Sequence, residues 1–228
     1  WIDSDFVRFR YGQPEKIGGF TAIGQKTIAG PARAQHTWND LEGRKYAALG
    51  TSKALYIYYE GAFYDITPTD TALTSATFNT TSGSATVTVN KSSHALDAGE
   101  YVTFSSVTVP TGSGYATTDF EDNAFEITNV TANTFDITMP SNSAATTSTS
   151  GSATIDPYVE IGPTIQTYGY GWGTGTWGRL TWGSGTTSST IILDPGSWSL
   201  DNFGEQLIAT IKDGKTFVWN PGLSNPLE

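Results

Sequence analysis

The 228-residue chain contains no cysteine, which excludes disulfide bonds, thiolate nucleophiles and metal centres with cysteine ligands. It has only two histidines, His36 and His94, and no Gly-x-Ser-x-Gly motif, so the sequence offers few candidate residues for a Ser–His–Asp catalytic triad. Glycine loops of the phosphate- or dinucleotide-binding type are missing too, as is the aspartate spacing of a calcium loop. The sequence therefore predicts that the protein is not an enzyme, and it implies neither a metal nor a cofactor.

Long apolar runs and charged residues are also scarce. No segment approaches the roughly 20 apolar residues of a membrane-spanning helix, so we expect no membrane insertion, and the N-terminus carries no export signal. Because the first residue is Trp1, we expect the chain to be a fragment of a longer protein.

Charged residues make up only 15% of the chain and aromatic residues 13%, while Ser, Thr, Asn and Gly supply the polar surface. This composition is typical of an all-β protein.

Acidic residues are concentrated in the middle of the chain, whose formal net charge is −10. Residues 1–65 hold eight basic and seven acidic side chains (+1), residues 66–160 one and ten (−9), and residues 161–228 three and five (−2). The middle stretch lacks Trp, is rich in Ser and Thr, and is bounded by Pro68 and Pro157. We therefore predict an N-terminal β segment (1–65), an inserted acidic β domain (66–160), and a Trp- and Gly-rich segment with a second hairpin (161–228).

Apolar and polar residues alternate repeatedly within the acidic middle part. This pattern is typical of short strands with one buried and one solvated face. The segments concerned are residues 84–89, 101–104, 124–130 and 134–138. The inserted domain is therefore expected to be a small β-barrel or sandwich.

The two flanking parts resemble each other, with a glycine, a strand, a tight turn and an aromatic strand recurring at the same spacing. The turn of the second copy contains Asp213-Gly214, which is a strong hairpin signal between apolar runs. A repeated hairpin unit favours partial β-propeller-like blades, with the middle domain inserted between them. The equivalent positions are Gly43 and Gly204, Ala48 and Ala209, and Leu55 and Thr216.

Alternating aromatic residues and glycines between residues 168 and 183 form the most unusual segment. One interpretation is a platform of rings that stacks on a sugar or on bases. The other, which we favour because Arg179 is the only basic residue here, is a connector whose rings wedge between blades or into a neighbouring subunit. The candidate interface or ligand-stacking residues are Tyr168, Tyr170, Trp172, Trp177 and Trp182.

Three acidic residues, Asp119, Glu121 and Asp122, form the strongest carboxylate cluster. A glycosidase needs two acids at a fixed separation, so a polysaccharide-cleaving site is a weak third hypothesis. A solvated polar loop is the interpretation that we prefer. His94 precedes a segment typical of a turn, and we expect it to stabilise that turn rather than act as a base.

Both flanks resemble the opening of large tail proteins of tailed bacteriophages. The resemblance lies in residues 7–20 (VRFRYGQPEKIGGF), 64–68 (YDITP) and 198–209 (WSLDNFGEQLIA). The middle part, with 99–104 (GEYVTF) and 130–135 (VTANTF), looks like a small β module that recurs in phage tail proteins.

This resemblance implies a structural virion protein of the tail hub, nozzle or head–tail junction, located in the virion and working by assembly. It further implies other virion proteins as partners, a homo-oligomeric ring, and passage of DNA without specific binding. The alternative function is a carbohydrate- or host-receptor-binding module, with a host glycan stacked on Trp172, Trp177 and Trp182.

Overall fold

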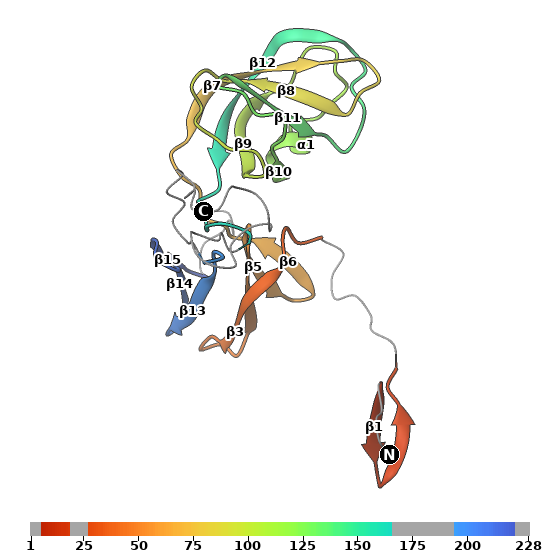
Figure 1. Ribbon diagram of the computed structural model, residues 1–228, viewed down its shortest axis with the longest axis vertical. Helices are drawn as coiled ribbons and strands as arrows, with labels where there is room; N and C mark the ends of the chain where they lie inside the picture. The colour runs from red at the N-terminus through yellow and green to blue at the C-terminus, as the bar shows by residue number, and fades with distance from the viewer. Residues whose placement is uncertain (1–5, 19–26, 166–193, 222–228) are drawn as a thin grey trace, which may run out of the picture.

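A computed structural model describes residues 6–18, 27–165 and 194–221. These residues form fifteen strands and one four-residue helix, arranged as four antiparallel sheets (Figure 1). The predicted all-β fold class is thus confirmed. Within the described ranges, no helix has the length and apolar character needed to cross a membrane.

The first sheet is a two-stranded hairpin of β1 (Val7–Arg10) and β2 (Gln13–Lys16). The turn between them is made by Tyr11 and Gly12, which both have positive φ. The hairpin lies apart from the other sheets (Figure 1).

The second sheet, which we call the first meander, has the strand order β3-β4-β5-β6. Buried and more exposed residues alternate along its second strand from Tyr46 to Gly50, as expected for a sheet with one packed face. Gly43 and Gly61 have φ of 82° and 88° in the tight turns, a conformation that strains other residues. The strands are β3 (Ala32–Asn39), β4 (Lys45–Thr51), β5 (Leu55–Tyr59) and β6 (Ala62–Asp65).

The second meander has three strands in the order β13-β14-β15. Its middle strand buries Leu207, Ala209 and Ile211, and the turn at Asp213-Gly214 leads into the last strand, as the sequence predicts. The strands are β13 (Trp198–Phe203), β14 (Gln206–Ile211) and β15 (Thr216–Trp219).

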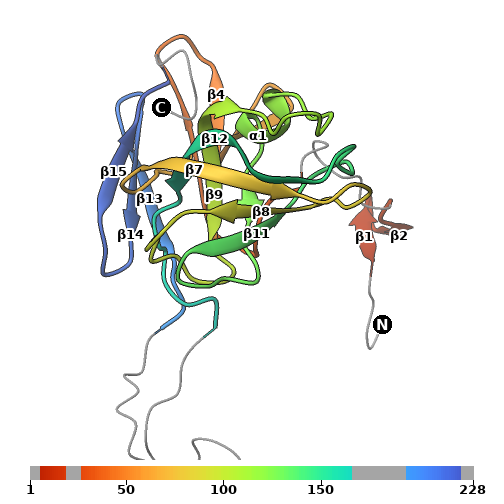
Figure 2. The ribbon, with the colours of Figure 1, turned by 90° about the horizontal axis from the view of Figure 1, so that it is seen from above.

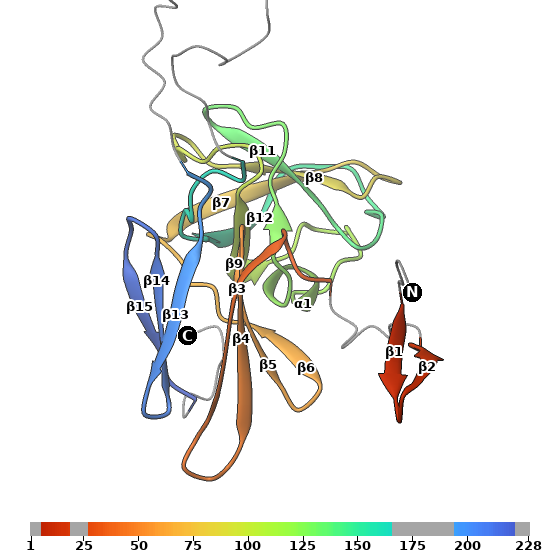
Figure 3. The same ribbon diagram turned by 60° about the horizontal axis from the view of Figure 1, so that its bottom comes forward.

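The two meanders pack against each other through one face of each sheet (Figure 3). A β-carbon at Gly50 would lie 2.6 Å from Cδ1 of Trp198, so glycine is needed for this contact. The indole nitrogen of Trp198 donates a hydrogen bond to the Thr51 carbonyl (3.1 Å), and that of Trp38 donates one to the Glu205 carbonyl (3.0 Å). We call the shared buried cluster the joint core: Trp38, Tyr46, Ala48, Leu55, Ile57, Ile66, Val159, Ile161, Trp198, Leu207, Ala209 and Ile211.

Strands β3–β5 and β13–β15 correspond to each other in order and in turn position. Ala48 and Ala209 are buried in the two middle strands, and Gly43 and Gly204 turn with positive φ between the first and second strands. Two such meanders, packed face against face, are compatible with neighbouring propeller-like blades.

The part of the chain that lies between the two meanders in sequence forms a six-stranded sheet, which curls into a nearly closed barrel (Figure 2). The strand order is β10-β9-β12-β7-β8-β11, and a bridge between Thr128 and Asp136 brings the two ends of the sheet together. Phe78, Phe104, Phe120 and Phe135 are buried in its core. The elements are β7 (Leu73–Thr80), β8 (Thr86–Asn90), β9 (Tyr101–Thr108), α1 (Thr118–Glu121), β10 (Phe125–Glu126), β11 (Thr134–Thr138) and β12 (Thr147–Pro157).

A buried polar contact links the barrel to the first meander. The Tyr158 hydroxyl donates to Asp65 Oδ2 (2.7 Å), and the Thr67 hydroxyl donates to Asp65 Oδ1 (2.6 Å). Burial raises the pKa of Tyr158, and the neighbouring Asp65 raises it further. Lys53 adds a second link by donating to the Gly99 carbonyl (2.6 Å).

Candidate interaction surfaces

The aromatic residues that the sequence singles out, Tyr168, Tyr170, Trp172, Trp177 and Trp182, lie outside the described residues. Their role in an interface or in ligand stacking stays a prediction. The candidate surfaces below are built from the two meanders and the barrel.

The acidic cluster of the barrel is tied to its own backbone. Asp119 accepts a hydrogen bond from the Ala116 amide (2.8 Å), and Glu121 accepts one from the Val107 amide (2.9 Å). Two of the three carboxylates therefore stabilise the loop around α1. Across the described ranges, no group of three or more histidine or acidic side chains could hold a metal ion.

Both histidines take part in local packing. His94 is buried in a turn, where its Nδ1 accepts a hydrogen bond from the Leu96 amide (3.1 Å) and its ring meets Phe135 edge-on. This is the turn-stabilising position that the sequence indicates. His36 lies between the meanders, with its Nε2 at 2.9 Å from Asn202 Oδ1 and its ring stacked on Trp38.

A buried carboxylate organises the turn between β3 and β4. Asp40 accepts hydrogen bonds from the amides of Glu42 (3.0 Å) and Arg44 (2.8 Å) and from the Arg44 guanidinium. Burial opposes its ionisation, but the bonds from Arg44 outweigh burial and hold the pKa of Asp40 below its usual value. The turn projects Leu41 into solvent, where 94% of the side chain is exposed.

Because the folded-state pKa of Asp40 is lowered, its ionised form stabilises the fold above the unfolded-state pKa, and this contribution is lost as the pH falls through the folded-state value. We expect the midpoint temperature of thermal unfolding, measured by Trp fluorescence, to decrease when the pH is lowered below about 4. An Asp40→Asn variant should be less stable at pH 7 and lose less on acidification. Asp122→Asn, at the exposed end of α1, is the control. An Asp40→Asn protein with the wild-type pH dependence would contradict this assignment.

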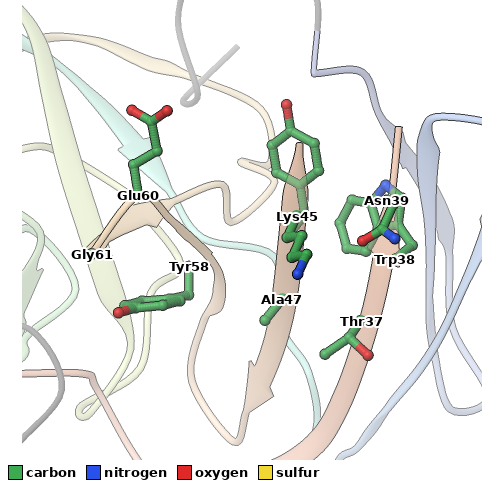
Figure 4. Close-up of a pocket in the computed structure, with 9 residues that line it drawn as sticks. Thr37, Trp38, Asn39, Lys45, Ala47, Tyr58, Glu60 and Gly61 are labelled. Atoms are coloured by element: carbon green, nitrogen blue, oxygen red, sulfur yellow. The ribbon is translucent and has the colours of Figure 1, made fainter. Parts of the chain in front are cut away.

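The first meander contains a groove of about 590 Å³, whose lining includes Trp38 and Tyr46 of the joint core. Thr37 pairs with Ala47, Ala47 with Tyr58, and Tyr58 with Phe63, so the four residues form one row across the sheet. Figure 4 shows the small side chains of Thr37 and Ala47 beside the Tyr58 ring, which leaves a hollow between the larger groups. Lys45 also lines this groove.

The outer face of the second meander carries exposed apolar side chains. Ile208 pairs with both Asp201 and Val218 across the sheet, and Phe203 lies on the same face by strand alternation. Phe203 is 75% exposed and Val218 is 61% exposed. We call Phe203, Ile208 and Val218 the apolar ridge.

Neither outer face is among the sites predicted from the sequence, although the sequence contains a signal for them. Residues 207–209, 217–219 and 55–59 are uninterrupted runs of apolar and aromatic residues. Strands with one solvated face alternate apolar and polar residues, whereas uninterrupted apolar runs are typical of strands that are covered on both faces.

Comparisons of the chain with protein-family models, with curated proteins and with solved structures give no match.

Proposed function

We propose that the chain is a structural component of a tailed-phage virion, at the tail hub, nozzle or head–tail junction, and that it acts by assembling with other virion subunits. The observation that carries this proposal is the apolar ridge of the second meander, whose Phe203 and Val218 side chains are largely exposed. Exposed apolar side chains that gather on one face are typical of surfaces that contact another protein. The resemblance of both flanks to phage tail proteins supports the choice of assembly.

The charge of the barrel supports the expected relation to DNA. Residues 66–160 contain one basic and ten acidic side chains. Proteins that hold a phosphate backbone do so mainly with Lys and Arg, whereas carboxylates repel it. This part of the chain therefore favours passage of DNA without specific binding.

Sedimentation of the purified chain over a range of concentrations tests the proposal. We expect the mean mass to rise above the monomer mass of 24.4 kDa as the concentration increases, because uncovered apolar faces associate by mass action. Far-UV circular dichroism of the same samples checks that the strands are formed. A folded chain that stays monomeric at every concentration, and that is missing from virions, would contradict the proposal.

A further inference from the structure

We propose that the groove of the first meander binds a saccharide that carries a carboxylate, with the sugar ring against Tyr58 and the carboxylate paired with Lys45. Such a site adds a ligand to the proposed assembly function and does not depend on it. It is also distinct from the stacking predicted on Trp172, Trp177 and Trp182, which lie outside the described residues.

The groove combines an aromatic ring, a cation and small polar side chains on one face of the sheet. Strand pairing places Thr37 beside Ala47, and Ala47 beside Tyr58. Asn39 lies beside Lys45 in another pair on the same face. Figure 4 shows the Lys45 side chain extending toward Ala47, in the space beside the Tyr58 ring. The volume of the groove lies within the usual range of small-molecule sites, about 300–1,000 Å³.

The Lys45 ammonium is available to a ligand. Lys45 is the basic residue among those that line the groove, and within the described ranges it forms no ion pair. Glu60 also lines the groove, but its carboxylate forms a hydrogen bond with the Tyr59 hydroxyl. In Figure 4 the Glu60 side chain points away from the Lys45 ammonium. The groove therefore offers an unpaired positive charge, and its carboxylate is already bound within the protein.

A groove on the barrel, of about 360 Å³, provides a comparison. Lys91 lines it together with Ser, Thr and Asn side chains, and its lining contains no aromatic residue. It belongs to the part of the chain that has a formal charge of −9, whereas residues 1–65, which form the first meander, carry +1. An anionic ligand with an apolar face is therefore better matched to the groove that contains Tyr58.

The side chains of the groove match the chemistry of an acidic sugar. A pyranose ring presents C–H groups on its face and hydroxyls around its edge. The flat ring of Tyr58, which Phe63 packs against at 5.0 Å between centroids, suits the apolar face. The Thr37 hydroxyl and the Asn39 carboxamide can both donate and accept hydrogen bonds, as sugar hydroxyls require. A carboxylate on the sugar would pair with Lys45 through charge-assisted hydrogen bonds.

Titrations with matched monosaccharides test the ligand class. Methyl glucuronide and methyl glucoside share a ring and differ in the carboxylate, and benzoate carries a carboxylate on an aromatic ring. We expect saturation-transfer NMR to detect methyl glucuronide bound to the folded chain, and the glucoside to bind about two- to fivefold more weakly, as the loss of one exposed ion pair predicts. Added salt should reduce this difference by screening the pair. No binding of methyl glucuronide, equal binding of both sugars, or stronger binding of benzoate would overturn the proposal.

Substitutions in the groove locate the site. Lys45→Gln removes the charge at an exposed position and should lower the affinity for methyl glucuronide to that for the glucoside. Ala47→Leu fills the groove without removing a proposed contact, and it should weaken the binding of both sugars. Lys91→Gln, in the barrel groove, is the matched control and should leave both affinities unchanged.

Far-UV circular dichroism checks that each variant is folded. If folded Lys45→Gln protein binds methyl glucuronide as tightly as the wild-type chain, the sugar binds elsewhere and the assignment of the groove is wrong. The assembly function is decided separately, by sedimentation of the chain without sugar.

Discussion

Replacement of Trp198 by alanine is expected to destabilise the joint core by about 3–5 kcal/mol, the usual cost of removing a large buried aromatic side chain. Trp198 is buried between the meanders, and its indole also donates to the Thr51 carbonyl. The loss should appear in chemical denaturation followed by Trp fluorescence, because Trp38, Trp198 and Trp219 all belong to the joint core or pack against it. Leu41→Ala, at a highly exposed position, is the control and should change stability by less than about 0.5 kcal/mol.

A double-mutant cycle of Trp198 and Gly50 tests the packing contact between these two residues. Gly50→Ala alone places a methyl group where Trp198 lies, so overpacking should cost about 1–3 kcal/mol. With Trp198→Ala present, the same methyl group enters the vacated space, and the two costs should not add. Strict additivity would contradict the packing of Trp198 on Gly50.

Replacement of Phe120 by alanine is expected to destabilise the barrel by about 3–5 kcal/mol. Phe120 is fully buried and contacts the rings of Phe78, Phe104 and Tyr115. The barrel sequence contains no Trp, so its unfolding is followed by far-UV circular dichroism, while Trp fluorescence follows residues outside the barrel, among them Trp38 and Trp198 of the joint core and Trp219, which packs against it. We expect the barrel transition to shift and the fluorescence transition to stay in place.

This second result depends on the barrel and the joint core being separate hydrophobic cores, which share no buried residue. Thr86→Ala, an exposed change in β8, is the matched control and should have a much smaller effect on the barrel transition. An equal shift of both transitions in the Phe120→Ala protein would mean that the chain unfolds as one unit, and the account of two cores would be wrong.

The fold follows largely from local sequence patterns. Alternation in residues 84–89 and 134–138 predicts strands that the structure contains, because a strand with one solvated face must alternate. The hairpin at Asp213-Gly214 follows from turn chemistry, which is equally local. The sequence predicts a barrel or a sandwich but cannot decide between them, because closure depends on pairing between residues distant in sequence, such as β7 with β12.

The candidate surfaces were harder to predict for the same reason. Ala47 has no property that marks it in the sequence, because only the pairing of the strands places it in a groove. Gly50 is likewise explained only by Trp198, which lies far along the chain. The uninterrupted apolar runs carried the available signal, because they show that both faces of these strands are made to be covered.

A structural role in a tailed-phage particle can be tested by cross-linking intact virions and identifying the neighbours of this chain by mass spectrometry. We expect cross-links to other virion proteins of the tail or head–tail junction. Purified particles that lack the chain would exclude this role.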